Sequence, residues 1–258
     1  MIPQIDLTQD ETQASQQLMA ALSEFGFARI ARHGISSALI SQAYRQTQLL
    51  FDLALEEKQS YALTNLGERG YTGFAKETAV GHSQADLKEF WHIGPEGNSD
   101  YPANLWPQQL PDFQGTMLAL YNSLDELASQ ILRLVARELD VPTAHFDALT
   151  QGGNSVLRLL HYPPLKQLDQ SQLNGAMRAA PHTDINLLTL LIGASTSGLQ
   201  IHSKQGEWID IEHESDDIII DTGDMMALLT DNQLPSTTHR VVNQGSDQAA
   251  ILFLIMFF

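Results

Sequence analysis

The sequence predicts a mainly β protein with flanking helices, arranged as a sandwich or jelly roll, and three observations support this fold class. After Gly153, short runs of β-type residues follow one another. Turn signals such as Gln205-Gly206 and Gln244-Gly245 separate these runs, whereas the first half of the chain shows helical periodicity. Many short strands with turns at this spacing are typical of two-sheet folds, and 258 residues suffice to bury a sizeable core.

The chain begins with a predicted strand over residues 2–7, followed by an amphipathic helix. Thr8 and Glu11 match a capping box, in which a hydroxyl and a carboxylate satisfy the first free amides of a helix. Apolar residues then recur with a helical period as far as Phe25. Gly26 is a typical residue at the end of a helix, so we expect the helix to stop there.

Further elements of the first half alternate between strands and helices. We expect a strand at 27–31, a helix from Ser36 or Ser37 to about 54, a strand at 88–93 and a long amphipathic helix at 113–139. The segment 61–82 is rich in glycine and polar residues, and a loop of this length often lies over a functional opening. Lys88 and Glu89 are expected to form a solvated pair at a strand edge.

The second half contains nine β-like runs, and their bounds define the predicted strands. They cover residues 155–162, 179–182, 187–192, 199–203, 207–211, 217–221, 225–229, 239–243 and 250–257. We expect two parts within one compact unit. Residues 1–110 would form an N-terminal α/β region, and residues 111–258 would hold the long helix and the β core with its site.

Composition excludes several classes of function. Lys plus Arg number 14 against 31 for Asp plus Glu, and the net charge of −17 opposes binding to nucleic acids and anionic membranes. The absence of cysteine excludes disulfides, thiolate metal sites and a cysteine nucleophile. The N-terminus lacks the pattern of a signal peptide, and the apolar run 249–258 is far shorter than the ~20 residues that span a bilayer. We therefore expect a cytoplasmic protein.

The candidate metal ligands are His182 and Asp184, with His239 as the third. Successive side chains of a strand alternate, so His182 and Asp184 would share one face while Thr183 points away. Two histidines and one carboxylate on one side of an octahedral ion form the facial arrangement of non-haem Fe(II) oxygenases. The ordinary alternative is a hydrogen-bonding histidine on a partly buried strand. A second His-x-Asp sequence at residues 145–147 follows a helix without flanking β runs, and we expect no metal there.

The order and spacing of several motifs resemble the isopenicillin N synthase-like branch of the iron(II)- and 2-oxoglutarate-dependent oxygenases. The similarity extends over nearly the whole chain. The motifs are Ile2-Pro3-Gln4-Ile5-Asp6-Leu7, Gly26-Phe27 through His33-Gly34-Ile35, Glu56-Glu57-Lys58, Arg69-Gly70-Tyr71, Asp86-Leu87-Lys88-Glu89, Leu157-Arg158, Tyr162-Pro163, His182-Thr183-Asp184, Gly198-Leu199-Gln200, Trp208, Gly223-Asp224 and His239-Arg240-Val241.

This resemblance implies a double-stranded β-helix, a cupin-like jelly roll with buttressing helices. It implies that His182, Asp184 and His239 are the catalytic metal ligands of Fe(II). The co-substrate 2-oxoglutarate and O2 would occupy the remaining iron positions, and a small-molecule substrate would be hydroxylated or desaturated. Tyr162 matches a family tyrosine that donates a hydrogen bond to the co-substrate.

The sequence departs from the family where the far carboxylate of 2-oxoglutarate binds. The family places Arg-x-Ser or Arg-x-Thr about nine to fourteen residues after the distal histidine, but residues 248–253 read Gln-Ala-Ala-Ile-Leu-Phe. A buried carboxylate without a cation costs several kcal/mol. Arg158 and Arg178 are the best substitutes for co-substrate binding, whereas alternation should turn Arg240 away from the metal. Leu160 stands where relatives often carry Asn.

Two alternatives stay open beside the oxygenase. A degenerate family member could keep the metal site for structure or ligand binding, and a cupin-like enzyme could use Zn(II) or Mn(II) with the same ligands. The remaining histidines, such as His33, His92 and His161, are expected to have only structural roles. The sequence ends inside an apolar run, so we also expect that the natural terminus could lie beyond Phe258.

Overall fold

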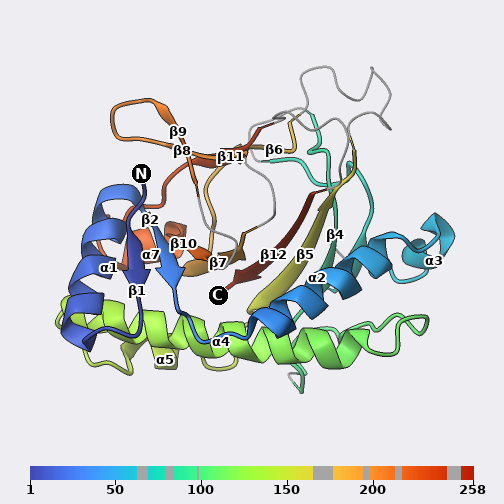
Figure 1. Cartoon of the computed structure of the whole chain (residues 1–258), viewed down its shortest axis with the longest axis horizontal. Coiled ribbons are helices and arrows are strands. Elements are labelled where there is room, and N and C mark those ends of the chain that lie inside the picture. Colours follow the sequence, from blue (N-terminus) through green and yellow to red (C-terminus); the bar gives the residue numbers. More distant parts are fainter. Residues whose placement is uncertain are drawn as a thin grey trace.

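The computed structural model describes residues 1–62, 69–79, 84–97, 99–164, 177–193, 198–212, 217–242 and 251–258. Two β-sheets face each other, and helices pack on the outside of the larger sheet (Figure 1). This is the helix-buttressed jelly roll that the sequence predicts. Within the described residues, no helix combines the length and the apolar character needed to cross a membrane.

The larger sheet contains strands from both halves of the chain. Its order among the described residues is β1 (Gln4–Asp6), β2 (Phe27–Ala31), β10 (Ile218–Thr222), β7 (Leu188–Ile192), β12 (Ile251–Phe257), β5 (Val156–Tyr162), β4 (Glu89–Ile93) and β3 (Gly70–Thr72). The smaller sheet has the order β6 (Ala179–His182), β11 (His239–Val241), β8 (Leu199–His202) and β9 (Trp208–Asp210). The division expected at residue 110 stays a prediction.

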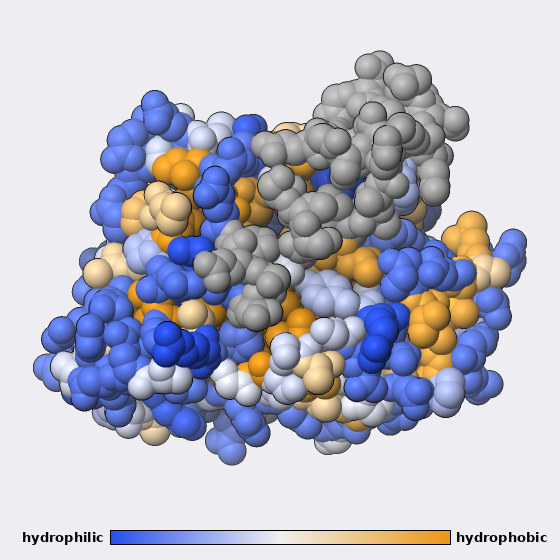
Figure 2. All heavy atoms as spheres, in the orientation of Figure 1, coloured by the Kyte–Doolittle hydropathy of each residue, from blue (hydrophilic) through white to orange (hydrophobic). Residues whose placement is uncertain are grey.

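Three long helices cover the outer face of the larger sheet. They are α1 (Glu11–Phe25), α2 (Ser37–Phe51) and α4 (Phe113–Glu138), and α4 runs in green along the base of Figure 1. Short helices α3 (Leu55–Gln59), α5 (His145–Thr150) and α7 (Asp224–Leu229) lie between the main elements. A 3.6-residue apolar stripe buries α4 against α1, α2 and the sheet, as the periodicity predicts. Polar side chains cover most of the face shown in Figure 2, with smaller apolar areas between them.

Three local expectations are wrong, each for a physical reason. Asp10, rather than Thr8, caps α1 by accepting from the amides of Thr12 and Gln13, and Thr8 instead donates to Asp6. The run 225–229 lies in α7, because a short apolar run has no period that separates a strand from a helix. Lys88 and Glu89 are both buried rather than solvated.

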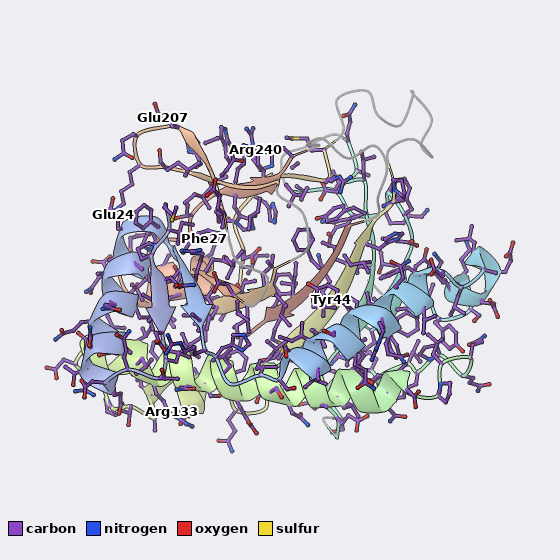
Figure 3. All side chains as sticks on the ribbon, in the orientation of Figure 1. Glu24, Phe27, Tyr44, Arg133, Glu207 and Arg240 are labelled. Atoms are coloured by element: carbon purple, nitrogen blue, oxygen red, sulfur yellow. The ribbon has the colours of Figure 1, made fainter. Side chains whose placement is uncertain are left out.

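Strand β5 shows how alternation creates an inner and an outer face of the larger sheet. Leu157 and Leu159 belong to the core beneath the helices. Arg158, Leu160 and Tyr162 instead line a cavity between the two sheets. Phe27, labelled in Figure 3, reaches the same cavity from β2. The sheet therefore separates a dry core from a cavity that carries polar groups.

Candidate metal centre

Strand pairing in the smaller sheet brings the distant histidines together. His182 ends β6 and His239 begins β11, and the two residues are directly opposite each other in the antiparallel register. Asp184 lies two positions beyond the end of β6, in the segment that leads to β7. The predicted ligands thus come from a strand, the loop after it and a neighbouring strand.

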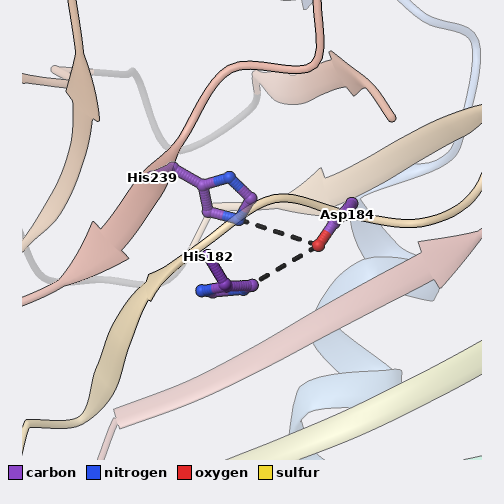
Figure 4. Close-up of side chains that lie close together, drawn as sticks. All are labelled: His182, Asp184 and His239. Carbon is purple, nitrogen blue, oxygen red and sulfur yellow. Dashed lines mark ion pairs between the residues drawn. The ribbon is translucent and has the colours of Figure 1, made fainter. Parts of the chain in front are cut away.

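The three side chains converge at one end of the cavity (Figure 4). The Nε2 atoms of His182 and His239 are each 3.8 Å from Oδ1 of Asp184, and the two ring centroids are 4.3 Å apart. One ligand atom from each residue lies within 4.8 Å of the others. Two imidazoles and a carboxylate at this separation can share one cation, and this donor set suits Fe(II). Among the described residues, no other group of three His, Cys, Asp or Glu side chains has this geometry.

Hydrogen bonds behind the ligands fix how each one faces the cation position. Nδ1 of His182 lies 2.7 Å from the carbonyl oxygen of Ala180, and Nδ1 of His239 lies 3.2 Å from that of Thr237. A proton on Nδ1 leaves the Nε2 lone pair for a metal. Thr189 donates its hydroxyl to Oδ2 of Asp184, which leaves Oδ1 directed at the histidines. The Nε2 and Oδ1 atoms are therefore the expected ligand atoms.

The electrostatic environment keeps the His239 side chain neutral. The pKa of His239 is lowered to about 4, chiefly by burial and in part by the nearby His182, although the Asp184 charge acts in the opposite direction. Burial and the Asp184 charge raise the pKa of Asp221, which lines the same cavity, well above its ordinary value. Both causes favour the protonated form of Asp221, which reduces the repulsion between two buried carboxylates.

Gly223 explains why the Gly223-Asp224 motif accompanies the metal ligands. A Cβ atom at position 223 would lie 2.2 Å from the carbonyl oxygen of Asn186 and 2.8 Å from that of Asp184. Only glycine leaves this space open. The amide of Asp224 then donates to the Asp184 carbonyl at 2.7 Å. The motif therefore holds the backbone that carries the carboxylate ligand.

Tyr162 lines another part of the cavity wall, and Arg178 lies next to its ring. Tyr162 is buried beside Phe253, and burial raises the pKa of its hydroxyl. The guanidinium carbon of Arg178 lies 5.8 Å from the centroid of the Tyr162 ring, and burial lowers the pKa of Arg178. Arg178 is 1% exposed. A cation is thus present beside the tyrosine that the resemblance implicates in co-substrate binding.

Arg158 lies elsewhere in the cavity wall and makes two hydrogen bonds to the carboxylate of Glu77. Its NH1 and NH2 groups each donate to one oxygen of Glu77 at 3.1 Å, and its Nε donates to Nε2 of His92 at 2.7 Å. Lys88 lies 2.6 Å from Glu77 and 2.8 Å from Asp86. Neither Lys88 nor Glu77 was predicted as a site residue. Apolar neighbours on both faces of 88–93 were the available signal that this strand is buried.

The other sequence expectations have mixed outcomes. Arg240 turns away from the metal centre, as predicted, because its guanidinium stacks on Trp208 at 3.8 Å and its Nε donates to Gln200 (Figure 3). The second His-x-Asp sequence lies on α5, where Asp147 pairs with Arg133. Residues 248–250 of the expected anchor window lie outside the described residues, as do residues 63–68 and 80–82 of the loop 61–82.

Two family models match the chain, and together they span most of it. Residues 2–112 match the non-haem dioxygenase in morphine synthesis N-terminal family, and residues 153–256 match the 2OG-Fe(II) oxygenase superfamily. A 2-oxoglutarate-Fe(II) type oxidoreductase of Emericella nidulans is 31% identical, covering 92% of this chain and 72% of the relative. A proline hydroxylase of Petromyces alliaceus is 34% identical, with coverages of 88% and 73%.

Solved structures show the same fold. A 2OG-Fe(II) oxygenase family protein from Caulobacter crescentus has a TM-score of 0.87 and 37% identity, and the match covers 99% of this chain and 85% of that chain. A full-length Neurospora crassa protein, crystallised in complex with alpha-KG, has a TM-score of 0.88 and 26% identity, with coverages of 99% and 84%. The jelly-roll prediction is therefore confirmed.

Proposed function

The chain belongs to the 2OG-Fe(II) oxygenase superfamily, and we propose a role for each residue of its site on this basis. The protein is an Fe(II)-dependent dioxygenase that uses 2-oxoglutarate and O2 to oxidise a small molecule. His182, Asp184 and His239 would hold the iron. The observation that carries this assignment is the convergence of their ligand atoms within 4.8 Å.

The protein residues prepare the centre, while the bound cofactor does the redox chemistry. Fe(II) with 2-oxoglutarate supplies the activation of O2 and the removal of a hydrogen atom from the substrate. The backbone carbonyls behind His182 and His239 orient the imidazoles, and Thr189 orients the carboxylate of Asp184. A cavity lined largely by apolar side chains limits the access of water to the reacting groups.

Arg178 and Tyr162 are the proposed anchors for the far carboxylate of 2-oxoglutarate. The resemblance places the anchoring arginine within the window 248–253, and Ile251 in that window pairs with Tyr162. Arg178 lies against Tyr162, so a buried cation stands next to a residue of the cavity wall and could substitute for the missing arginine. A guanidinium and a phenol together offer the donors that a buried carboxylate requires.

Arg158 is the weaker of the two predicted anchors. It pairs with Ile255, four positions along β12 from Ile251, and Glu77 already accepts from two of its N–H groups. A strand rises about 3.3 Å per residue, so Arg158 and Tyr162 are separated by roughly 13 Å along β5. Arg158 would therefore contact a different ligand.

Hydroxylation of a C–H bond is the proposed reaction type. Relatives include a proline hydroxylase and a dioxygenase of Streptomyces hygroscopicus named for validamycin A, and the Neurospora crassa protein has also been crystallised with thymine. These compounds differ in chemistry, so they support a small molecule as the substrate. Which molecule binds depends on the residues that line the cavity. A complete triad with oriented ligands also favours catalysis over the non-catalytic alternative.

The test is succinate formation after anaerobic Fe(II) loading and addition of 2-oxoglutarate and O2. The wild-type protein should form succinate, and His182→Ala should lower the yield to the level of free iron because a ligand is lost. Arg178→Gln should raise the KM for 2-oxoglutarate at least about tenfold, the equivalent of one charge-assisted contact. Arg133→Gln, on the exposed side of α4, is the matched control. Equal KM values in the two Arg variants would refute the anchor assignment.

A further inference from the structure

Two cations at the cavity wall, the buried Lys88 and the half-buried Arg158, both pair with the carboxylate of Glu77. The side chains of Lys88 and Arg158 are 8% and 17% exposed, and both line the cavity that contains the metal ligands. Glu77, which contacts both, is 35% exposed and comes from the segment between β3 and β4. The carboxylate is thus the most accessible member of the cluster.

The balance of charge in this cluster depends on Glu77. Lys88 also pairs with Asp86, whose other oxygen accepts from the amide of Ala180 and is therefore tied to β6. Burial by itself would raise the pKa of Glu77, but Arg158 and Lys88 lower it to about 2. Glu77 is therefore anionic at any working pH, and its departure from the cluster would leave one uncompensated cation facing the cavity.

The guanidinium of Arg158 is held independently of Glu77. Its carbon lies 4.2 Å from the ring centroid of Phe90 and 5.1 Å from that of Phe257, and its Nε donates to His92. The stacking on the two rings and the hydrogen bond to His92 fix the plane of the Arg158 guanidinium. The two N–H groups that contact Glu77 therefore form a preorganised bidentate site for a carboxylate.

Within this cation pair, Arg158 lies towards the metal, whereas Lys88 lies nearer Tyr162, because the next residue, Glu89, pairs with His161. Phe257, against which Arg158 stacks, pairs with Thr189, and the Thr189 hydroxyl holds the ligand Asp184. Tyr162 lies four residues farther along β5. A ligand on Arg158 would therefore approach the metal centre from a different direction than a ligand on Arg178.

We propose that Arg158 and Lys88 form a carboxylate-binding subsite for the primary substrate, and that Glu77 is an internal carboxylate which the substrate displaces. The subsite selects an organic acid with an apolar or aromatic body, because Leu160, Ile255 and Phe257 line the same cavity. This inference rests on the proposed function, since it takes the metal centre as the place of reaction. The backbone of Glu77 stays bonded to Asp86, so its side chain alone exchanges.

Binding of acids and of their matched amides tests the proposal. Calorimetry on the anaerobic protein, loaded with Fe(II) and 2-oxoglutarate, would use acetate, benzoate and 3-phenylpropanoate with the corresponding amides. Glu77→Gln should tighten the binding of at least one acid about tenfold and change that of its amide less than about twofold, because the internal competitor is lost. Adding Arg158→Gln to this variant should abolish the preference for the acid. Glu207→Gln, on the exposed β8–β9 turn, is the matched control.

The opposite results would overturn the subsite. If Glu77 only positions Arg158, Glu77→Gln weakens the binding of acids. The proposal is also wrong if no acid binds the Glu77→Gln protein more tightly than its amide does. The visible charge-transfer absorption of Fe(II) with 2-oxoglutarate separates this failure from that of the proposed function. The absorption should persist in Glu77→Gln and Arg158→Gln, whereas its absence from the wild-type protein would contradict the metal centre itself.

Discussion

Two carboxylates, Glu89 and Glu77, form ion pairs on opposite faces of the sheet at β4 and β5. The two side chains differ in their exposure to solvent. On the helix side, the side chain of Glu89 is 8% exposed and accepts from Lys58, His161 and Tyr71. On the cavity side, Glu77 contacts two cations but remains 35% exposed. The first carboxylate is enclosed by donors, whereas the second has an open side.

This contrast separates the ion pairs that hold the fold from those that remain available to a ligand. Lys58 also donates to the carbonyl of Phe51, and the ring of His161 stacks on Phe51, so the Glu89 cluster joins α2, α3 and the sheet. Breaking it leaves a buried charge without a counter-ion. The Glu77 cluster joins a loop to the cavity wall, and water or another anion can replace the carboxylate there.

The largest expected effect is on stability and belongs to the enclosed carboxylate. Glu89→Gln leaves the Lys58 ammonium buried without its counter-charge, so we expect a loss of about 3–5 kcal/mol in the free energy of unfolding. Urea unfolding of the metal-free protein measures it. The double variant Lys58→Met with Glu89→Leu should recover part of the loss, since no charge is then buried. If Glu89→Gln lost as little stability as Glu77→Gln, the claim that Glu89 stabilises the fold more than Glu77 would be wrong.

An intermediate effect concerns pH and a third buried group, His239. Its pKa is lowered to about 4 from an ordinary value near 6.5, chiefly by burial. The unfolded chain therefore binds a proton that the folded chain does not, and stability falls as pH drops from about 6.5 towards 4. At about 1.4 kcal/mol per pKa unit, the loss for the metal-free protein is of order 3 kcal/mol. In His239→Gln, the stability measured across the same pH range should show a shallower slope.

Glu89 should cause a separate loss of folding stability at lower pH. Burial alone would raise the pKa of Glu89, but hydrogen bonds from His161 and Tyr71 and the charge of Lys58 lower it overall. Its stabilising contribution is therefore complete above about pH 4.3, the ordinary pKa of glutamate, and is lost as pH falls below that value. Retention of the full acid sensitivity in this lower range by Glu89→Gln would count against this cluster.

The smallest effect on stability is expected at Glu77. Because the side chain is partly exposed, Glu77→Gln should change the free energy of unfolding by less than about 1 kcal/mol. The same variant should alter the binding of acids, so its stability and its ligand affinity become separable. A stability loss of several kcal/mol would show that Glu77 supports the fold as Glu89 does.

The metal triad could be predicted from the sequence because its information is local or carried by motif order. Strand alternation predicted a common side for His182 and Asp184, although Asp184 lies in the loop after β6. His239 was named with them and supported by motif order, and β-pairing sets it opposite His182. The buried face of α4 could also be predicted, because its apolar residues recur with the period of a helix. Arg178 and Tyr162 were named as co-substrate residues, and their roles stay predictions although they lie together.

The clusters around β4 and β5 could not be predicted, because they depend on tertiary contacts. Lys88 and Glu89 are adjacent and oppositely charged, which suggested a solvated pair, yet their side chains take partners on opposite sides of the sheet. Glu77 lies in a loop without periodicity, and its contact with Arg158 spans two elements. His161 contacts Glu89 and His92 contacts Arg158, and no local pattern indicated these partners.

The central claim can be tested with an anomalous-scattering map at the iron absorption edge, from crystals grown anaerobically with Fe(II). We predict a single strong peak about 2.0–2.2 Å from Nε2 of His182, Nε2 of His239 and one carboxylate oxygen of Asp184. Both histidines should keep Nδ1 on the carbonyls of Ala180 and Thr237. Iron bound at any other position, or a peak that omits His239, would contradict the metal centre on which the proposed roles depend.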